Sequence, residues 1–76
     1  MHENKNIGFI GGGMVAEAII RGLILHGHDA SKIYVSEPSE DRRNIIYILN
    51  KKLNINENNQ DVFDGSDVLI ICVNSQ

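Results

Sequence analysis

Short apolar runs alternate with stretches of helical spacing along this chain, and the alternation predicts strands that alternate with helices. Ile7–Ile10 is a short apolar run that ends at three glycines, which is typical of a buried strand. Met14–Leu25 has apolar residues at helical spacing and predicts a helix with a broad buried stripe. The stripe is expected to contain Val15, Ala16, Ile19, Ile20, Leu23 and Ile24. Glu17 and Arg21 are placed to pair one turn apart, and Gly27 suits a left-handed helix stop.

A second strand and helix follow with the same pattern. Residues 33–35 form a short apolar strand, and Pro38 ends it. Ser39 is placed to cap a helix that continues to Lys52, with acidic residues in its first turn and basic residues in its last. Its buried face is expected to be Ile45, Leu49 and Leu53.

The remaining segments predict two more strands. Asn54 is expected to end the second helix, and Ile55 marks a very short third strand. Residues 59–65 could form one or two helical turns, and residues 67–73 predict a central strand that is covered on both faces. The order β-α-β-α-β-(α)-β indicates an α/β chain with a Rossmann-type open parallel sheet of strand order 3-2-1-4.

Composition narrows the class of protein. The chain has 76 residues, ten acidic against seven basic, so it is one domain at most and lacks the basic surface that nucleic-acid binding requires. Its apolar runs are too short for a signal peptide or a membrane span, which predicts a cytoplasmic protein with no membrane partner. The single cysteine, Cys72, is expected to be a small core residue. His2, His26 and His28 lack partners at metal-ligand spacing and are expected at the surface.

The segment between the first strand and the first helix predicts a phosphate site. Gly11, Gly13 and Ala16 fit the pattern G-x-G-x-x-A in the setting that dinucleotide binding requires. Gly11 would allow the tight turn, Gly13 would let the backbone approach a pyrophosphate, and Ala16 would allow close packing of helix on sheet. The free N–H groups that follow would point at the phosphates. The expected contacts are Gly11, Gly12, Gly13, Met14, Val15 and Ala16. The alternative is a glycine turn that binds nothing.

The end of the second strand bears on the choice of cofactor. Glu37 follows the glycine turn by about 20 residues, where an acidic side chain accepts hydrogen bonds from the adenosine ribose and favours NAD. Ser36, Ser39, Arg42 and Arg43 could instead supply donors and positive charge to the 2′-phosphate of NADP. Both cofactors stay open, and the two arginines could equally form a solvated helix face.

Two further candidates lie where strands end, at the edge where open α/β sheets bind ligands. Val73 and Asn74 follow the fourth strand, and Asn59 precedes the short third helix. Asn59 could contact a ligand or could simply cap that helix, and the second role is the more common one for asparagine.

Three stretches of sequence, spread over residues 8–76, carry a family resemblance: GFIGGGMVAEAIIRGL, KIYVSEPSEDRR and SDVLIICVNSQ. They resemble the N-terminus of the pyrroline-5-carboxylate reductase family, and the resemblance covers nearly all of the chain. The resemblance implies the N-terminal part of an NAD(P)-binding Rossmann domain, without the helical C-terminal domain through which that family dimerises. It also implies a parent enzyme that reduces the imine of 1-pyrroline-5-carboxylate to L-proline with NADPH or NADH, in proline biosynthesis.

The same resemblance implies cofactor contacts for the glycine turn, Ser36, Glu37, Asn59, Val73 and Asn74, and a homo-oligomeric parent. No residue of the chain is assigned a catalytic role, and the 76 residues alone are expected to be inactive. Met14 stands where the family commonly has Asn, and Asn74 and Ser75 stand where it commonly has Lys and Pro. These departures keep two alternatives open: a non-catalytic nucleotide-binding relative, or another oxidoreductase with an architecture like that of 6-phosphogluconate dehydrogenase.

Overall fold

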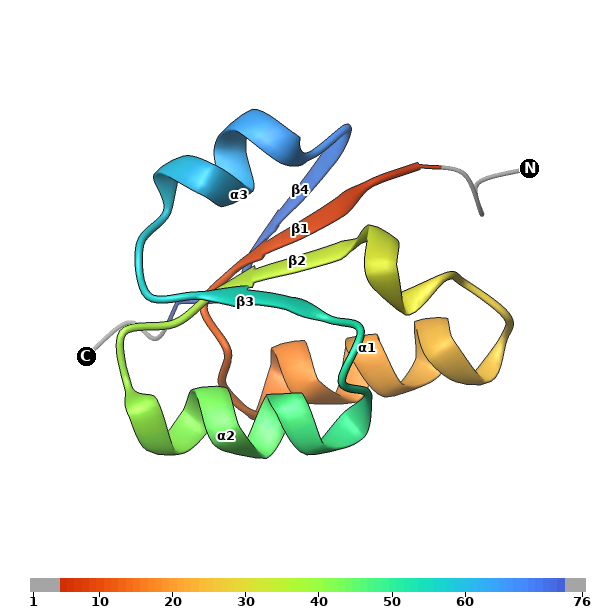
Figure 1. Ribbon diagram of the computed structural model, residues 1–76, viewed down its shortest axis with the longest axis horizontal. Coiled ribbons are helices and arrows are strands. Elements are labelled where there is room, and N and C mark those ends of the chain that lie inside the picture. Colours follow the sequence, from red (N-terminus) through yellow and green to blue (C-terminus); the bar gives the residue numbers. More distant parts are fainter. Residues whose placement is uncertain (1–4, 74–76) are drawn as a thin grey trace.

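The computed structural model describes residues 5–73, which form a four-stranded parallel sheet with helices on both faces (Figure 1). The strands lie in the order β3-β2-β1-β4, and every neighbouring pair is parallel, so the predicted topology is confirmed. Helices α1 and α2 cover one face of the sheet, and α3 covers the other. The elements are β1 (Ile7–Ile10), α1 (Met14–Leu25), a 3₁₀ turn (Ala30–Lys32), β2 (Ile33–Ser36), α2 (Glu40–Leu49), β3 (Asn54–Asn56), α3 (Gln60–Gly65) and β4 (Val68–Ile71).

The core lies between the central strands and the helices that cover them. All four residues of β1 are buried, because this strand has a neighbour on each side and helices above and below. The side chains without solvent exposure include Phe9, Ile20, Ile33, Val35 and Ile46. These residues come from two strands and two helices, so the core depends on the crossover connections being made.

The buried stripe of α1 is narrower than predicted. Ala16 and Ile20 are fully buried, but Val15 is 65% exposed and Ile19 is 37% exposed. Successive residues of a helix point about 100° apart, so a helix that rests on the sheet through Ala16 and Ile20 turns the preceding residues outward. The prediction that Val15 and Ile19 face the sheet was therefore wrong. Gly27 has φ of +95°, which confirms the expected left-handed stop.

Helix α2 ends earlier than predicted. It stops at Leu49, and Asn50 adopts an extended conformation in which its side-chain oxygen accepts a hydrogen bond from the N–H of Lys52. An asparagine side chain that bonds its own backbone competes with continuation of a helix. The predicted basic last turn is therefore absent from this helix, and its one fully buried residue is Ile46 rather than Ile45.

The predicted role of Asn54 as a helix stop was also wrong, since Asn54 begins β3. Its side-chain amide donates to the carbonyl oxygens of Ser31 and Ile33, which ties the start of this edge strand to β2. The predicted short strand at Ile55 is confirmed, as is the short helix after it, which begins at Gln60.

The predicted order 3-2-1-4 places β4 at the edge of this sheet, and within residues 5–73 it pairs with β1 alone. Val68 and Ile71 are 46% and 66% exposed, so the prediction of a central strand covered on both faces was wrong for this part of the chain. An uninterrupted apolar run can come from a strand with both faces covered, but the run does not reveal how many neighbours the strand has.

Two sequence-based expectations concern membranes and metals. Within residues 5–73, the structure contains no helix of the length and apolar character needed to cross a membrane. The same part of the chain holds no group of three or more histidine, cysteine or carboxylate side chains placed to share a metal ion. His26 is exposed as expected, but His28 is half-buried and its Nε2 is enclosed, which corrects its expected surface position. His2 lies outside the described residues.

Candidate nucleotide-binding site

The glycine turn begins at Gly11, whose conformation only glycine adopts without strain. Its φ is +104°, and a Cβ atom at this position would lie 2.6 Å from the carbonyl oxygen of Cys72. Its N–H donates to the carbonyl oxygen of Ser36 over 2.8 Å, which joins the turn to the end of β2. The predicted role of Gly11 in a tight turn is confirmed.

Gly13 has no such structural requirement. It precedes α1 with φ of −78°, a value open to any residue, and a Cβ atom here would meet nothing within 4 Å. No side chain among residues 5–73 caps the helix at this end, so within this part of the chain the first N–H groups of α1 are left for an outside acceptor. Met14 is 80% exposed beside them. Neither packing nor backbone conformation explains a glycine at position 13, whereas close approach by a ligand would.

Glu37 holds the turn in place. One of its carboxylate oxygens accepts the N–H of Gly12 over 2.7 Å, and the other accepts the N–H of Ser39 over 2.9 Å. Each oxygen keeps a further lone pair, so a ribose hydroxyl could still donate to it. The sequence predicted a ligand contact for Glu37, but the bond to the glycine turn appears only in the folded chain.

Arg42 connects α2 to both the glycine turn and α1. Its Nε donates to the carbonyl oxygen of Gly12 over 2.9 Å, and its Nη2 lies 3.0 Å from a carboxylate oxygen of Glu17. Glu17 also pairs with Arg21 over 3.2 Å, as predicted. The hydrogen bond from Arg42, followed by the one from Arg21, lowers the pKa of Glu17. Arg43 donates instead to two backbone carbonyl oxygens of the β2–α2 connection. Neither arginine is a simple solvated side chain.

Ser39 caps a helix with its side chain, as predicted, but Asn59 does not. The hydroxyl of Ser39 accepts the N–H of Arg42 and caps α2, as predicted. Asn59 precedes α3, but its side chain makes no capping bond. Its Oδ1 instead accepts the hydroxyl proton of Ser36 over 2.6 Å, and Ser36 is 1% exposed. The capping prediction for Asn59 was therefore wrong.

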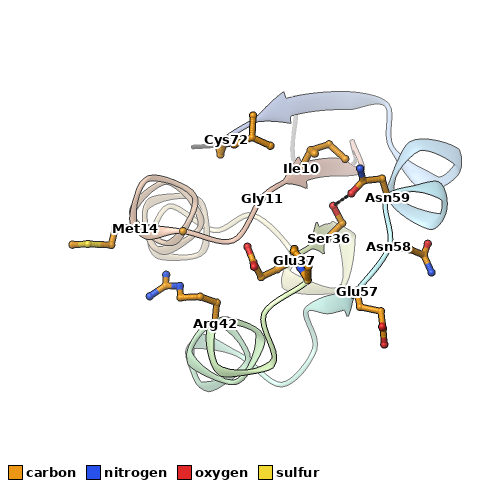
Figure 2. Close-up of a pocket in the computed structure, with 13 residues that line it drawn as sticks. Ile10, Gly11, Met14, Ser36, Glu37, Arg42, Glu57, Asn58, Asn59 and Cys72 are labelled. Carbon is orange, nitrogen blue, oxygen red and sulfur yellow. Dashed lines mark hydrogen bonds between the residues drawn. The ribbon is translucent and has the colours of Figure 1, made fainter. Parts of the chain in front are cut away.

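A cleft of about 900 Å³ opens where these segments meet (Figure 2). Seven of the predicted contacts line it: Gly11, Gly13, Met14, Ser36, Glu37, Asn59 and Val73. Arg42 lies at its edge. The sequence did not single out other lining residues, which are Ile10, Pro38, Glu57, Asn58 and Cys72. The sequence feature that these residues share, and that could have indicated them, is their position: each lies at or just after the carboxyl end of a strand.

The other predicted contacts lie beside or beneath this cleft. Val15 lines a neighbouring hollow of about 420 Å³ with Met14 and Ile71, and Ala16 is fully buried under the turn. Gly12 and Ser39 contribute through their backbone N–H bonds to Glu37. Asn74 lies outside the described residues.

Cys72 is partly buried and packs against the core, as predicted. Burial raises the pKa of its thiol. The thiol is therefore protonated at neutral pH and contributes bulk rather than charge to the cleft.

Comparison with known proteins gives a family match over residues 6–76, to the family described as NADP oxidoreductase, coenzyme F420-dependent. A pyrroline-5-carboxylate reductase of Haemophilus influenzae is 36% identical over 74 residues, and one of Pasteurella multocida is 40% identical over 78 residues. Both alignments cover 97% of this chain, but 27% and 28% of the relatives. The chain thus spans about a quarter of the length of these curated relatives.

The fold agrees with the sequence comparison. A solved pyrroline-5-carboxylate reductase from Coxiella burnetii superimposes with a TM-score of 0.82 and 33% identity, over 91% of this chain and 25% of that one. The resemblance predicted from the glycine turn and its helix is thereby confirmed. The chain belongs to the family described as NADP oxidoreductase, coenzyme F420-dependent, and is similar to the Rossmann-type segment of pyrroline-5-carboxylate reductases.

Proposed function

We propose that the cleft binds NADH or NADPH, with the pyrophosphate against the glycine turn and the N-terminus of α1. The observation that carries the proposal is the open space at Gly13, next to a helix end that no side chain caps. Uncapped N–H groups and the positive end of the helix dipole attract phosphate oxygens. The N–H groups of Gly13, Met14 and Val15 would hold these oxygens.

The adenosine ribose would lie toward Glu37 and Arg42, which line the cleft from the β2 side. Glu37 favours NADH because a carboxylate repels a 2′-phosphate. Arg42 favours NADPH because its guanidinium lies at the cleft edge, although Gly12 and Glu17 already hold it. A direct comparison of the two cofactors therefore belongs in the test.

For the full-length parent, we propose the reaction that the relatives' names state. The nicotinamide would supply a hydride to the imine carbon of 1-pyrroline-5-carboxylate, the nitrogen would take a proton, and L-proline would form. The similarity to reductases over 97% of the chain supports this proposal. We further propose that the parent is a cytoplasmic homo-oligomer in proline biosynthesis, with its imine substrate bound by residues other than those of this chain.

Titration of the ¹⁵N-labelled chain with NADPH and NADH, followed by NMR, tests cofactor binding. We expect the amide signals of Gly13, Met14 and Val15 to move most. The dissociation constant should be about 0.1 mM or weaker, because a complete dinucleotide site uses two β-α-β halves. A submicromolar constant would contradict the expected weakness. Unmoved signals for these three amides at millimolar cofactor would overturn the binding proposal.

The description of the matched family favours a second candidate, another NADP-dependent oxidoreductase that uses coenzyme F420. The same titration separates the two. Addition of coenzyme F420 to the chain saturated with NADPH should move no further signals if the reductase proposal is right. A second set of moving signals that adjoins the cleft would favour the F420 alternative.

A further inference from the structure

Ser36 is a buried polar residue whose hydroxyl has a specific partner. It is the last residue of β2 and 1% exposed, and its carbonyl oxygen accepts the N–H of Gly11. The backbone bond fixes the residue against the glycine turn. Its hydroxyl donates to the Oδ1 of Asn59 over 2.6 Å (Figure 2). A buried hydroxyl generally needs such a partner, so this bond is expected to persist.

The bond determines which end of the Asn59 amide is available. An asparagine side chain carries one acceptor oxygen and one NH₂ group with two donors. Ser36 holds the oxygen on its own side of the amide, so the NH₂ group lies on the opposite side, and no capping bond to α3 uses the side chain. Asn59 is exposed and lines the cleft, so its NH₂ group is accessible to a ligand there. An NH₂ group can bind only an acceptor, such as a phosphate or ribose oxygen.

We propose that Ser36 is a positioning residue that orients the Asn59 amide so that its NH₂ group, not its oxygen, meets an acceptor oxygen of the bound cofactor. The inference rests on the proposed cofactor binding. It adds that Asn59 is the donor in its contact with the cofactor, and that the bond to Ser36 sets this orientation. Ser36 acts through Asn59 in this scheme. Ser36 ends β2 and Asn59 comes three residues after β3, and these two parallel strands are neighbours, so residues distant in sequence can pair at their carboxyl ends.

The variant Asn59→Asp removes the NH₂ group and keeps the bond to Ser36. Aspartate retains an oxygen that accepts from Ser36, and it is tolerated at the start of a helix as well as asparagine is, so the melting temperature should stay near that of wild type. The variant loses the NH₂ donor and presents a negative charge to an anionic ligand. The matched control is Asn58→Asp, which brings the same charge to the next residue of the cleft. Figure 2 shows the Asn58 side chain pointing away from Ser36.

We expect Asn59→Asp to bind NADPH and NADH about tenfold more weakly than Asn58→Asp, because only the first variant loses a donor to a charged or polar oxygen. The readout is the dissociation constant from the NMR titration. Equal constants for the two variants would overturn the inference. If wild type itself gave no shifts at Gly13 and Met14, cofactor binding would fail instead, so the two failures are distinguishable.

A double-mutant cycle tests whether Ser36 acts through Asn59. Ser36→Ala should weaken binding and reduce the cofactor-induced shift of the Asn59 side-chain NH₂ signals. Combined with Asn59→Ala, it should cause no loss beyond that of Asn59→Ala alone. Losses that simply add would show that Ser36 does not position Asn59, and would overturn that part of the inference.

Discussion

Gly11 and Gly13 differ in what surrounds the position that a Cβ atom would occupy. At Gly11 the carbonyl oxygen of Cys72 lies 2.6 Å from that position, and φ is positive. At Gly13 the position is open and φ is negative. Glycine is thus required by the fold at position 11, whereas at position 13 it leaves open space at the cleft.

A matched pair of alanine substitutions should separate these two roles. Gly11→Ala should lower the free energy of unfolding by about 1–3 kcal/mol, because it imposes backbone strain and a close contact. Gly13→Ala should cost less than about 1 kcal/mol, as a poorer helix cap, yet weaken cofactor binding by about tenfold. Thermal denaturation and the NMR titration measure the two effects. Unchanged cofactor affinity in Gly13→Ala would remove the pyrophosphate role of this residue.

Replacement of Glu37 by serine should change both stability and cofactor preference. The variant loses the acceptors for the N–H groups of Gly12 and Ser39, so we expect a loss of about 1–3 kcal/mol. It also removes a charge that repels a 2′-phosphate, so the affinity ratio should shift toward NADPH. Glu37→Gln keeps one acceptor oxygen and should give the same direction of shift with a smaller loss of stability. A ratio equal to that of wild type in both variants would show that Glu37 does not face the ribose.

At the scale of elements, the glycine turn is held by the helices around it. Arg42 on α2 reaches both the turn and Glu17 on α1, and Glu37 at the end of β2 reaches the turn from the other side. These contacts hold the start of α1 in place, and none of them involves the first N–H groups of the helix, which stay available to a ligand. Such preorganisation leaves less ordering for a ligand to impose on binding.

The link between α1 and α2 should weaken in acid. Hydrogen bonds from Arg42 and Arg21 hold the pKa of Glu17 below its ordinary value, so the charged carboxylate is favoured in the folded state. This contribution to stability is fully present above the ordinary pKa of a glutamate in the unfolded chain, and is lost as the pH falls through the lower folded pKa.

Denaturation of wild type and Glu17→Gln between about pH 6 and pH 3 measures this contribution. The difference in stability between the two proteins should shrink as the pH falls. Glu57→Gln serves as the control, since Glu57 is exposed and makes no ion pair within residues 5–73. A difference that stays constant over this range would show that the Arg42 pair does not stabilise the fold.

At the scale of the whole molecule, parallel pairing brings the carboxyl ends of the strands to one edge. The glycine turn, Glu37, Asn59 and Val73 follow or precede different elements, and all of them line one cleft there. This arrangement follows the general rule for open α/β sheets, in which ligands bind beyond the carboxyl ends of the strands.

The 76-residue chain should not catalyse oxidation of NADPH or NADH by 1-pyrroline-5-carboxylate. A complete dinucleotide site uses two β-α-β halves, and no residue of this chain is assigned to the imine. The loss of cofactor absorbance with time measures the reaction, with the full-length Coxiella burnetii reductase as the positive control. Turnover above the uncatalysed rate would contradict this prediction and place substrate-binding residues within the chain.

The sequence by itself determined the order and type of the elements and the turn at Gly11. Hydrophobic period, glycine and capping chemistry are local properties, and the identity of Ser39 as a cap needs only residues three positions away. The parallel order 3-2-1-4 also followed, because right-handed crossovers leave few topologies for such an alternation.

Only the tertiary structure decided which side chains meet. It turned Val15 away from the sheet, and it joined Ser36 to Asn59, Glu37 to Gly12 and Arg42 to Glu17. The last three pairs are separated by 23 to 25 residues, so no local pattern records them. The partner of a side chain at such a separation in sequence is determined by how the helices pack on the sheet. That arrangement depends on the packing of the whole core.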